Sequence, residues 1–222
     1  MKKKIVGMIA CMLWVGWAQA QEMKDVFINM PDSISGVLTK VNREDCVDFL
    51  ASNMKAQVTN LYDRQSELTA LTNDYLFLQA TPQSSWEMKL LPVNDSTKVV
   101  CFIRSVCAPV CDSKVEFYTT DWQPLAKSDY LQQPVADSFF LPTDPVHADS
   151  LATLRKEADL TFLKASLSPD DTSLSYAYTT LDFVRKETAD KLRAYIRKSP
   201  IRYEWVGGKF CLLYTSDAAD DL

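Results

Sequence analysis

Six cysteines and one histidine are the residues of this 222-residue sequence with the most varied chemistry. Cys107 and Cys111 flank the tripeptide Ala-Pro-Val, between two strand-like runs. A tight loop with a proline at its centre brings the strand ends together, so we expect a structural Cys107–Cys111 disulfide. Cys46 and Cys101 then either pair with each other or remain buried thiols, and their spacing does not choose between these outcomes.

A zinc site and a redox dithiol are the active roles that such cysteines could have. Three cysteines and His147 make a formal zinc set, but the paired ligand spacing of zinc sites is missing. A redox pair reads Cys-x-x-Cys at a helix start, where the helix dipole lowers the thiol pKa, whereas Cys107 and Cys111 are one residue further apart and a strand follows them. Cys46 has no recognisable base to activate it as a nucleophile. We therefore expect no metal and no cofactor.

Motifs for hydrolysis and phosphate binding are also missing. His147 is the only histidine that could serve a Ser/His/Asp triad, and no G-x-S-x-G elbow presents a serine. Five glycines leave no phosphate-cradling loop. The carboxylate pairs Glu44-Asp45 and Asp170-Asp171 fall in a predicted helix start and a predicted β-turn, which explain acidic residues without catalysis. We predict no catalytic residues, and the sequence favours a protein that is not an enzyme.

Aromatic residues lie on or beside the predicted strands, where most of them must fill the core. If one sheet face is uncovered, tyrosines and tryptophans there would form a contact surface for a protein, peptide or glycan. The candidates for such a binding surface are Trp86, Tyr118, Trp122, Tyr176 and Tyr178.

The charge balance excludes other partners. The formal net charge is −5 at pH 7, and no basic run is present. Nucleic acid and anionic membrane surfaces are bound through basic patches, so we expect neither as a partner.

The first twenty residues have the pattern of a secretory signal peptide. Met1-Lys-Lys-Lys is a positive region, Ile5–Trp17 is apolar, and Ala18-Gln19-Ala20 is a small-x-small cleavage site. The apolar run is short for a membrane span. An uncleaved anchor and lipidation at Cys11 are the alternatives. We expect cleavage after residue 20, no membrane insertion afterwards, and a periplasmic or secreted protein.

The last residues resemble something other than protein. The string CLLYTSDAADD, at 211–221, resembles one translated frame of a sequencing adapter. We therefore expect 211–222 to be a non-native tail and exclude it from the domain, which we place at 21–210. The tail should pack poorly, and the strand ending at Val206 should lack part of its partner.

The first half predicts helices followed by strands. One helix covers 23–30, and a second begins after an Asn42 N-cap, with a buried stripe at Val47, Leu50, Ala51 and Met54. The period then changes to two, which predicts strands at 75–81, 85–93, 98–106 and 114–120. Their short connections favour an antiparallel meander.

The second half predicts two helices and further strands. Helices are expected at 149–158 and 187–197, with a hairpin of 160–167 and 173–180 between them. Alternation from Ile201 predicts a last strand, which Gly207-Gly208 turns. The fold class is therefore α+β: antiparallel meander sheets with a few helices in a single compact domain. The similar strings at 76–81 and 161–166 suggest two diverged helix-plus-sheet repeats, with sub-halves at 21–126 and 146–210.

Six segments together carry a family resemblance. In chain order they are MPDSI, TNDYLFLQ, EMKLL, CAPVCDSKVEFYTTDW, LSPDDTSLSYAYTT and EWVGGKF. They resemble domain of unknown function 3256 (DUF3256), a family of exported proteins of Bacteroidales, over nearly all of 23–210. The resemblance implies export and a compact α+β body. It implies no reaction and transfers no site residues.

These observations favour a non-enzymatic exported domain that binds a protein, peptide or glycan. One alternative is a small-molecule-binding or enzymatic domain with a cavity between its helices and a curved sheet. Another is an inhibitor-like module built from the two repeats.

Overall fold

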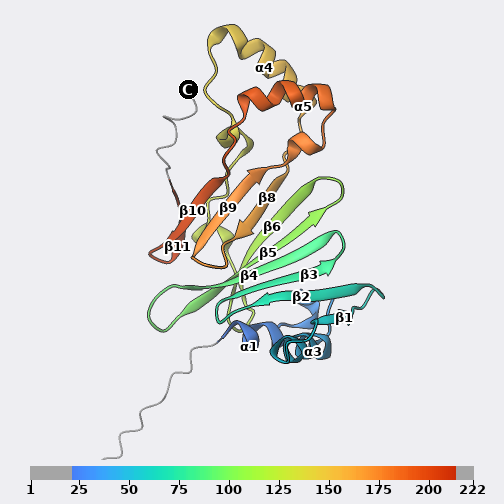
Figure 1. The fold of residues 1–222 in the computed structure, drawn as a ribbon. Helices are drawn as coiled ribbons and strands as arrows, with labels where there is room; N and C mark the ends of the chain where they lie inside the picture. The colour runs from blue at the N-terminus through green and yellow to red at the C-terminus, as the bar shows by residue number, and fades with distance from the viewer. Residues whose placement is uncertain (1–21, 214–222) are drawn as a thin grey trace, which may run out of the picture.

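The computed structural model describes residues 22–213, which form two antiparallel sheets and several helices (Figure 1). The predicted α+β class with antiparallel sheets is confirmed. The predicted signal peptide, residues 1–20, and residues 214–222 of the predicted tail lie outside the described residues.

The larger sheet is a meander of seven strands in sequence order. The four strands predicted for this region are confirmed as β3 to β6. The strands are β1 (Gln57–Thr59), β2 (Gln65–Leu71), β3 (Tyr75–Thr81), β4 (Ser84–Pro92), β5 (Lys98–Cys107), β6 (Cys111–Thr119) and β7 (Pro124–Leu125).

Strands β1 and β2 were not predicted, because their sequence is weakly apolar. In β2 only Ser66 and Leu68 are buried, and the register with β3 shifts between Leu68 and Ala70. Pairing with β3, which is strongly apolar, rather than the strand's own pattern makes this segment extended.

Three helices cover one face of this sheet, namely α1 (Met23–Ile28), α2 (Asp32–Ser35) and α3 (Lys40–Ala51). Their apolar side chains and the facing residues of β2 to β6 form one buried cluster, the helix-side core. The indole Nε1 of Trp122 donates to the Val26 carbonyl at 2.9 Å, which joins the end of the meander to α1.

The predicted start and buried stripe of α3 are wrong in detail. Thr39 is the N-cap, and Asn42 lies at the third helical position, where the two residues form a capping box. The helix ends at Ala51, so Met54 falls beyond it and is exposed, and the buried residues are Arg43, Cys46 and Val47. The first turn holds no acidic residue. The inward face of the helix was assigned wrongly because it contains a buried arginine, a residue type that is usually exposed.

The smaller sheet has four strands in the order β11-β10-β9-β8. They are β8 (Leu163–Leu167), β9 (Ser173–Tyr178), β10 (Ile201–Val206) and β11 (Lys209–Leu212). The predicted hairpin and the alternation from Ile201 are confirmed. Gly207 and Gly208 have φ of +58° and +82°, as a two-residue hairpin turn with both central residues left-handed requires.

Strand β11 continues past Phe210. Its four residues pair with Tyr203–Val206, so the prediction that β10 lacks a partner there is wrong. Cys211 is half-buried and Leu212 is 41% exposed, so the continuation is paired but not buried in the core. The adapter origin of 211–221 stays a prediction.

Helices α4 (Pro145–Glu157) and α5 (Lys186–Leu192) lie together beyond one end of the smaller sheet (Figure 1). Four short 3-10 helices connect these parts, at Lys127–Asp129, Ala136–Phe139, Thr180–Asp182 and Arg193–Tyr195. Helix α4 begins four residues before its predicted start, because the Asp144 side chain caps it by accepting from His147 N–H at 2.9 Å.

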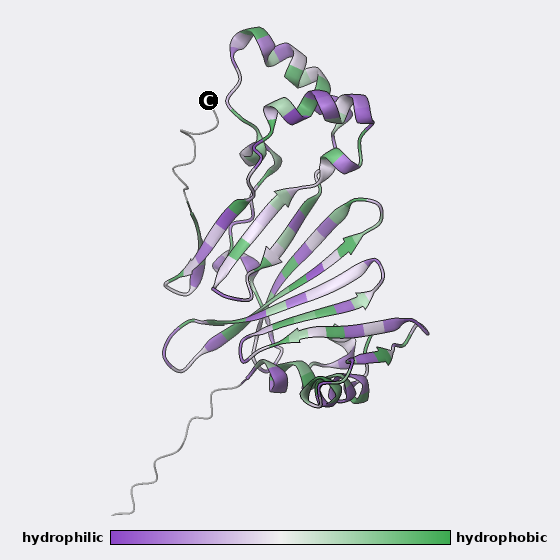
Figure 2. Ribbon diagram, in the orientation of Figure 1, coloured by the Kyte–Doolittle hydropathy of each residue, from purple (hydrophilic) through white to green (hydrophobic). Residues whose placement is uncertain are grey.

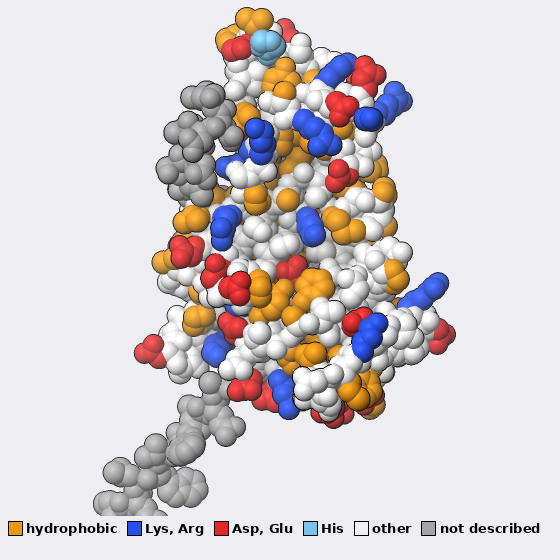
Figure 3. Space-filling model, in the orientation of Figure 1, with side chains coloured by type: hydrophobic (Ala, Val, Ile, Leu, Met, Phe, Trp, Pro, Cys, Tyr) orange, Lys and Arg blue, Asp and Glu red, His pale blue; other side chains and the backbone are white. Residues whose placement is uncertain are grey.

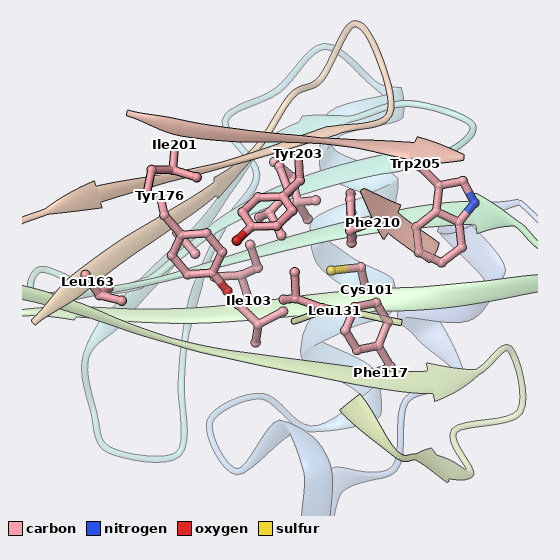
Figure 4. Close-up of a cluster of buried hydrophobic side chains, with 14 of the residues drawn as sticks. Cys101, Ile103, Phe117, Leu131, Leu163, Tyr176, Ile201, Tyr203, Trp205 and Phe210 are labelled. Atoms are coloured by element: carbon pink, nitrogen blue, oxygen red, sulfur yellow. The ribbon is translucent and has the colours of Figure 1, made fainter. Parts of the chain in front are cut away.

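The two sheets share a second buried cluster, the inter-sheet core (Figure 4). Tyr75, Cys101 and Phe117 of the larger sheet meet Tyr176 and Trp205 of the smaller one there. Hydrophobic and hydrophilic residues alternate along several strands (Figure 2). Residues of both predicted sub-halves therefore belong to one core.

The predicted repeat does not match the topology. The string at 76–81 is in β3, the third strand of its sheet, whereas the string at 161–166 leads into β8, an edge strand. The two strings occupy different positions.

None of the helices within residues 22–213 is both long and apolar enough to cross a membrane.

Candidate functional site

The Cys107–Cys111 disulfide is present and closes the tip of the β5–β6 hairpin. Cys46 and Cys101 are free and buried, and they lie on opposite faces of the larger sheet, in the helix-side core and the inter-sheet core respectively. The sheet between them prevents a bond. Burial raises the pKa of the Cys46 thiol to about 11 and raises that of Cys101 further, so both are inert at neutral pH.

Four of the five aromatic residues proposed for a binding surface are buried, and that prediction is wrong for them. Trp86, Tyr118 and Trp122 lie in the helix-side core, and Tyr176 lies in the inter-sheet core. Tyr178 is partly buried and contacts Phe139 and Phe140. The reason is that both faces of the larger sheet are covered, one by helices and the other by the smaller sheet.

His147 and the carboxylate pairs do not converge on a site. The His147 ring lies 2.9 Å from Asp144 at the exposed start of α4, and these hydrogen bonds lower the pKa of Asp144. Within residues 22–213, no group of three or more His, Cys, Asp or Glu side chains gathers as metal binding requires. On the face in Figure 3, charged side chains of both signs are interspersed.

A buried polar seam, which was not predicted from the sequence, joins the two sheets. Glu87 and Lys89 alternate with apolar residues on β4, and both point toward the smaller sheet. The Lys89 ammonium lies 3.1 Å from both an Asp74 carboxylate oxygen and the Pro169 carbonyl. Burial raises the pKa of Glu87. The available signal was two charged residues at i and i+2 inside an apolar strand.

The edge of β8 is held by side chains of the larger sheet. Its alternate N–H groups, at Leu163, Ala165 and Leu167, donate to Asp112 Oδ1, Ser113 Oγ and Glu87 Oε2 at 3.1, 3.0 and 2.7 Å. An unpaired strand edge is thereby satisfied without a further strand. The seam is explained by this structural role.

A hollow lies along the opposite edge of the smaller sheet. A groove of about 700 Å³ separates the 128–138 segment from β10 and β11, and a second hollow of about 260 Å³ adjoins it. We call the two together the β11 groove. Residues common to both are Pro134, Ser138, Tyr203 and Leu212. No sequence signal marked the 128–138 segment as part of a groove.

Polar and apolar groups contribute about equally to the lining of the β11 groove. Gln132, Gln133 and Ser138 line it, with Asp129 and Lys209 as the charged residues of the larger hollow and Arg197 in the smaller. No acid–base pair is within hydrogen-bond distance among these lining residues.

The two tyrosines of the groove are engaged in packing. The Tyr130 ring is stacked with Phe117 and with Trp205, at centroid distances of 5.0 and 6.1 Å. Tyr203 is 5% exposed, and its hydroxyl donates to the Gln132 carbonyl at 3.1 Å. Neither ring presents an open face on which a sugar could stack.

Comparison with known proteins identifies the family. The model of the family described as "Protein of unknown function (DUF3256)" matches residues 16–210. The chain belongs to this family. A solved structure, of a domain of an uncharacterized protein from Porphyromonas gingivalis W83, is similar with 25% sequence identity and a TM-score of 0.79. The alignment covers 88% of this chain and 100% of that one. A search of curated proteins found no match. The resemblance noted in the sequence is confirmed, and this DUF3256 chain has a fold that a solved structure shares.

Proposed function

We propose that this DUF3256 protein is a non-enzymatic binding module whose β11 groove takes an extended peptide segment of a partner protein. The observation that supports this most directly is the position of the groove, along the β11 edge of the four-stranded sheet, which no further strand of the described residues covers. A sheet edge is the surface to which an extended peptide adds as a further strand.

The backbone of β11 is oriented for such an addition. In an antiparallel ladder, the backbone groups of alternate residues point toward and away from the partner strand. Phe210 N–H donates away from β10, to the Tyr130 carbonyl at 2.8 Å, and Leu213 N–H donates to Arg202 of β10 at 2.8 Å. Leu212, two residues after Phe210, therefore directs its N–H and C=O toward the groove. Leu212 belongs to the predicted non-native tail, but backbone recognition does not depend on which side chain occupies this position, so the proposal requires only an extended residue there.

The size and chemistry of the groove agree with a peptide. Sites for drug-sized ligands have volumes of about 300–1,000 Å³, and the larger hollow, about 700 Å³, falls in this range. The rings of Tyr130 and Tyr203 are packed against other side chains and present no open face to a sugar, so the groove suits a peptide better than a glycan. The alternative hypothesis requires a small-molecule cavity between the helices and the sheet. Side chains such as Phe27, Met88 and Phe102, all 0% exposed, fill that space.

A random peptide pool tests the proposal. The chain is immobilised and exposed to synthetic peptides of about ten residues, long enough for one strand, and retained peptides are identified by mass spectrometry. Ser138→Trp fills the groove with an indole from an exposed position, and Ser33→Trp, at an exposed position in α2, is the matched control.

We expect the unchanged chain and Ser33→Trp to retain the same peptides and Ser138→Trp to retain none of them. Equal retention by Ser138→Trp would show that the groove is not the site. No retention by any form, with binding to an oligosaccharide panel instead, would replace the peptide by a glycan.

The module acts, in this proposal, outside the cytoplasm. Residues 1–20 have the pattern of a signal peptide, and a disulfide persists in oxidising compartments. The test is N-terminal sequencing of the chain from the periplasmic and medium fractions, with Gln21 expected first. A chain that keeps Met1, or that fractionates with the cytoplasm, contradicts export.

A further inference from the structure

The hairpin tip that the disulfide closes is also the part of the larger sheet that holds β8. Three consecutive residues at the start of β6 contact the smaller sheet. The Cys111 carbonyl accepts from Thr179 Oγ1 at 2.6 Å, Asp112 Oδ1 accepts from Leu163 N–H, and Ser113 Oγ accepts from Ala165 N–H. The position of these three acceptors depends on how firmly the tip is fixed.

The disulfide joins the two strand ends at the tip, together with one backbone hydrogen bond within the loop, from Ala108 N–H to the Val110 carbonyl at 3.2 Å. Cys107 and Cys111 face each other in the ladder, but Cys107 N–H donates outward, to the Gln83 carbonyl at 2.8 Å, and the Cys111 carbonyl points outward to Thr179. This is the non-hydrogen-bonded type of antiparallel pair, in which no backbone hydrogen bond links the two residues. The covalent bond therefore supplies the connection at this pair.

The third contact of the β8 edge is independent of the tip. Leu167 N–H donates to Glu87 of β4, which lies far along the chain from the cysteines and is buried. One half of β8 is thus held by the tip and the other half by the interior of the sheet. Both cysteines are partly exposed, so a small reductant can reach the bond.

We propose that the Cys107–Cys111 disulfide is a redox-reversible lock on the first half of β8. A dithiol attacks one cysteine sulfur, the S–S bond breaks, and a mixed disulfide forms. The second thiol of the dithiol then displaces the bound cysteine, and the reagent leaves as a cyclic disulfide. Cys107 and Cys111 each take up a proton as thiols. Only the Ala108–Val110 hydrogen bond then closes the loop, so the strand ends separate more readily, which releases Leu163 and Ala165 and exposes part of a strand edge to other chains.

Residue-resolved amide hydrogen exchange by NMR tests this lock. Exchange is measured for the full chain as isolated, after treatment with dithiothreitol, and after reoxidation. Because losing one hydrogen bond costs about 0.5–1.5 kcal/mol, exchange at Leu163 and Ala165 should accelerate by up to about ten-fold on reduction. Leu167 should stay within about two-fold of its starting rate, and reoxidation should restore all three rates.

Two variants separate the lock from other effects. Cys107→Ser/Cys111→Ser should show the reduced pattern and not respond to dithiothreitol. Asp112→Ala should accelerate amide exchange at Leu163 but not at Ala165 or Leu167 while the disulfide is intact. Unchanged rates at Leu163 and Ala165 after reduction overturn the proposal, and so does equal acceleration at Leu167, which indicates general loosening. If the double variant does not fold, the comparison of oxidised and reduced chain decides alone.

Discussion

The buried carboxylate of Glu87 accepts a hydrogen bond from the backbone N–H of Leu167 at 2.7 Å, eighty positions along the chain. This contact joins the middle of the seven-stranded sheet to the edge of the four-stranded one. Burial disfavours the charged form of Glu87 and raises its pKa, and the hydrogen bond from Leu167 partly offsets this effect.

Substitutions at Glu87 separate the hydrogen bond from the charge. Glu87→Gln keeps an acceptor and removes the charge, so the free energy of unfolding at neutral pH should be unchanged or higher. Glu87→Ala leaves the buried Leu167 N–H without its partner, so the free energy of unfolding should fall by about 1–3 kcal/mol. Urea unfolding of both variants measures the difference, and equal losses would contradict this role.

The pH dependence of stability follows from the same pKa. A carboxyl group whose pKa is raised by folding binds its proton more tightly in the folded state. Its contribution is fully present below the pKa of the unfolded chain and is lost as pH rises through the folded pKa. The free energy of unfolding should therefore fall less for Glu87→Gln than for the unchanged chain between about pH 4 and neutrality. Parallel curves would show that Glu87 is not the titrating group.

Two tyrosines of the inter-sheet core form a matched pair for a second prediction. Figure 4 shows both rings in the inter-sheet core. The Tyr176 hydroxyl is buried and has no hydrogen-bond partner among the described residues, whereas the Tyr203 hydroxyl donates to the Gln132 carbonyl. Tyr176→Phe should leave stability unchanged or raise it, and Tyr203→Phe should lower it by about 0.5–1.5 kcal/mol. Thermal unfolding of the two variants checks this, and a larger loss for Tyr176→Phe would reveal an unrecognised partner.

Arg43 should be the most sensitive residue of the helix-side layer. Its guanidinium donates to the Leu38 carbonyl at 2.7 Å, to those of Ile28 and Met30, and to Asp32 at 3.0 Å, with the side chain 1% exposed. Burial lowers its pKa. Arg43→Met keeps the length but leaves the buried carbonyls of Leu38 and Met30 without their donor, which should cost about 1–3 kcal/mol for each carbonyl. Denaturant unfolding with Arg64→Met, an exposed control, tests this, and equal stability of the two variants would refute it.

The free cysteines should differ in reactivity. Cys211 is half-buried, whereas Cys46 and Cys101 are completely buried and have raised pKa values. In a chain without residues 1–20, a thiol reagent at pH 8 should modify Cys211 at once and the other two only as the chain unfolds. Mass spectrometry over time shows the order. Rapid modification of Cys101 would mean that the two sheets separate readily.

Much of the fold follows from local pattern. Strands β3 to β6 and the β8–β9 hairpin follow from strand-like runs in the sequence, and Gly207-Gly208 marks the turn between β10 and β11. The disulfide follows from two cysteines at a hairpin tip. In contrast, β2 is recognisable only through its pairing with β3. The buried face of α3 contains Arg43, which a hydrophobic pattern assigns to the surface.

The β11 groove could not be predicted, for a different reason. It forms where the irregular 128–138 segment passes β10 and β11, so its shape depends on tertiary packing. The predicted aromatic binding surface was wrong because the two sheets pack face to face and helices cover the other face of the larger sheet. That packing buries Tyr176, and the helices bury Trp86, although neither residue's neighbours in sequence show this.

The most direct test of the proposed function is amide hydrogen exchange at Leu212 with and without a peptide retained from the random pool. Strand addition predicts that the Leu212 N–H, which points toward the groove, becomes protected when peptide is added, while Cys211, already paired with Glu204 in the β10–β11 ladder, changes little. Protection that appears elsewhere in the chain, with Leu212 exchanging at the same rate, would contradict peptide binding at this edge.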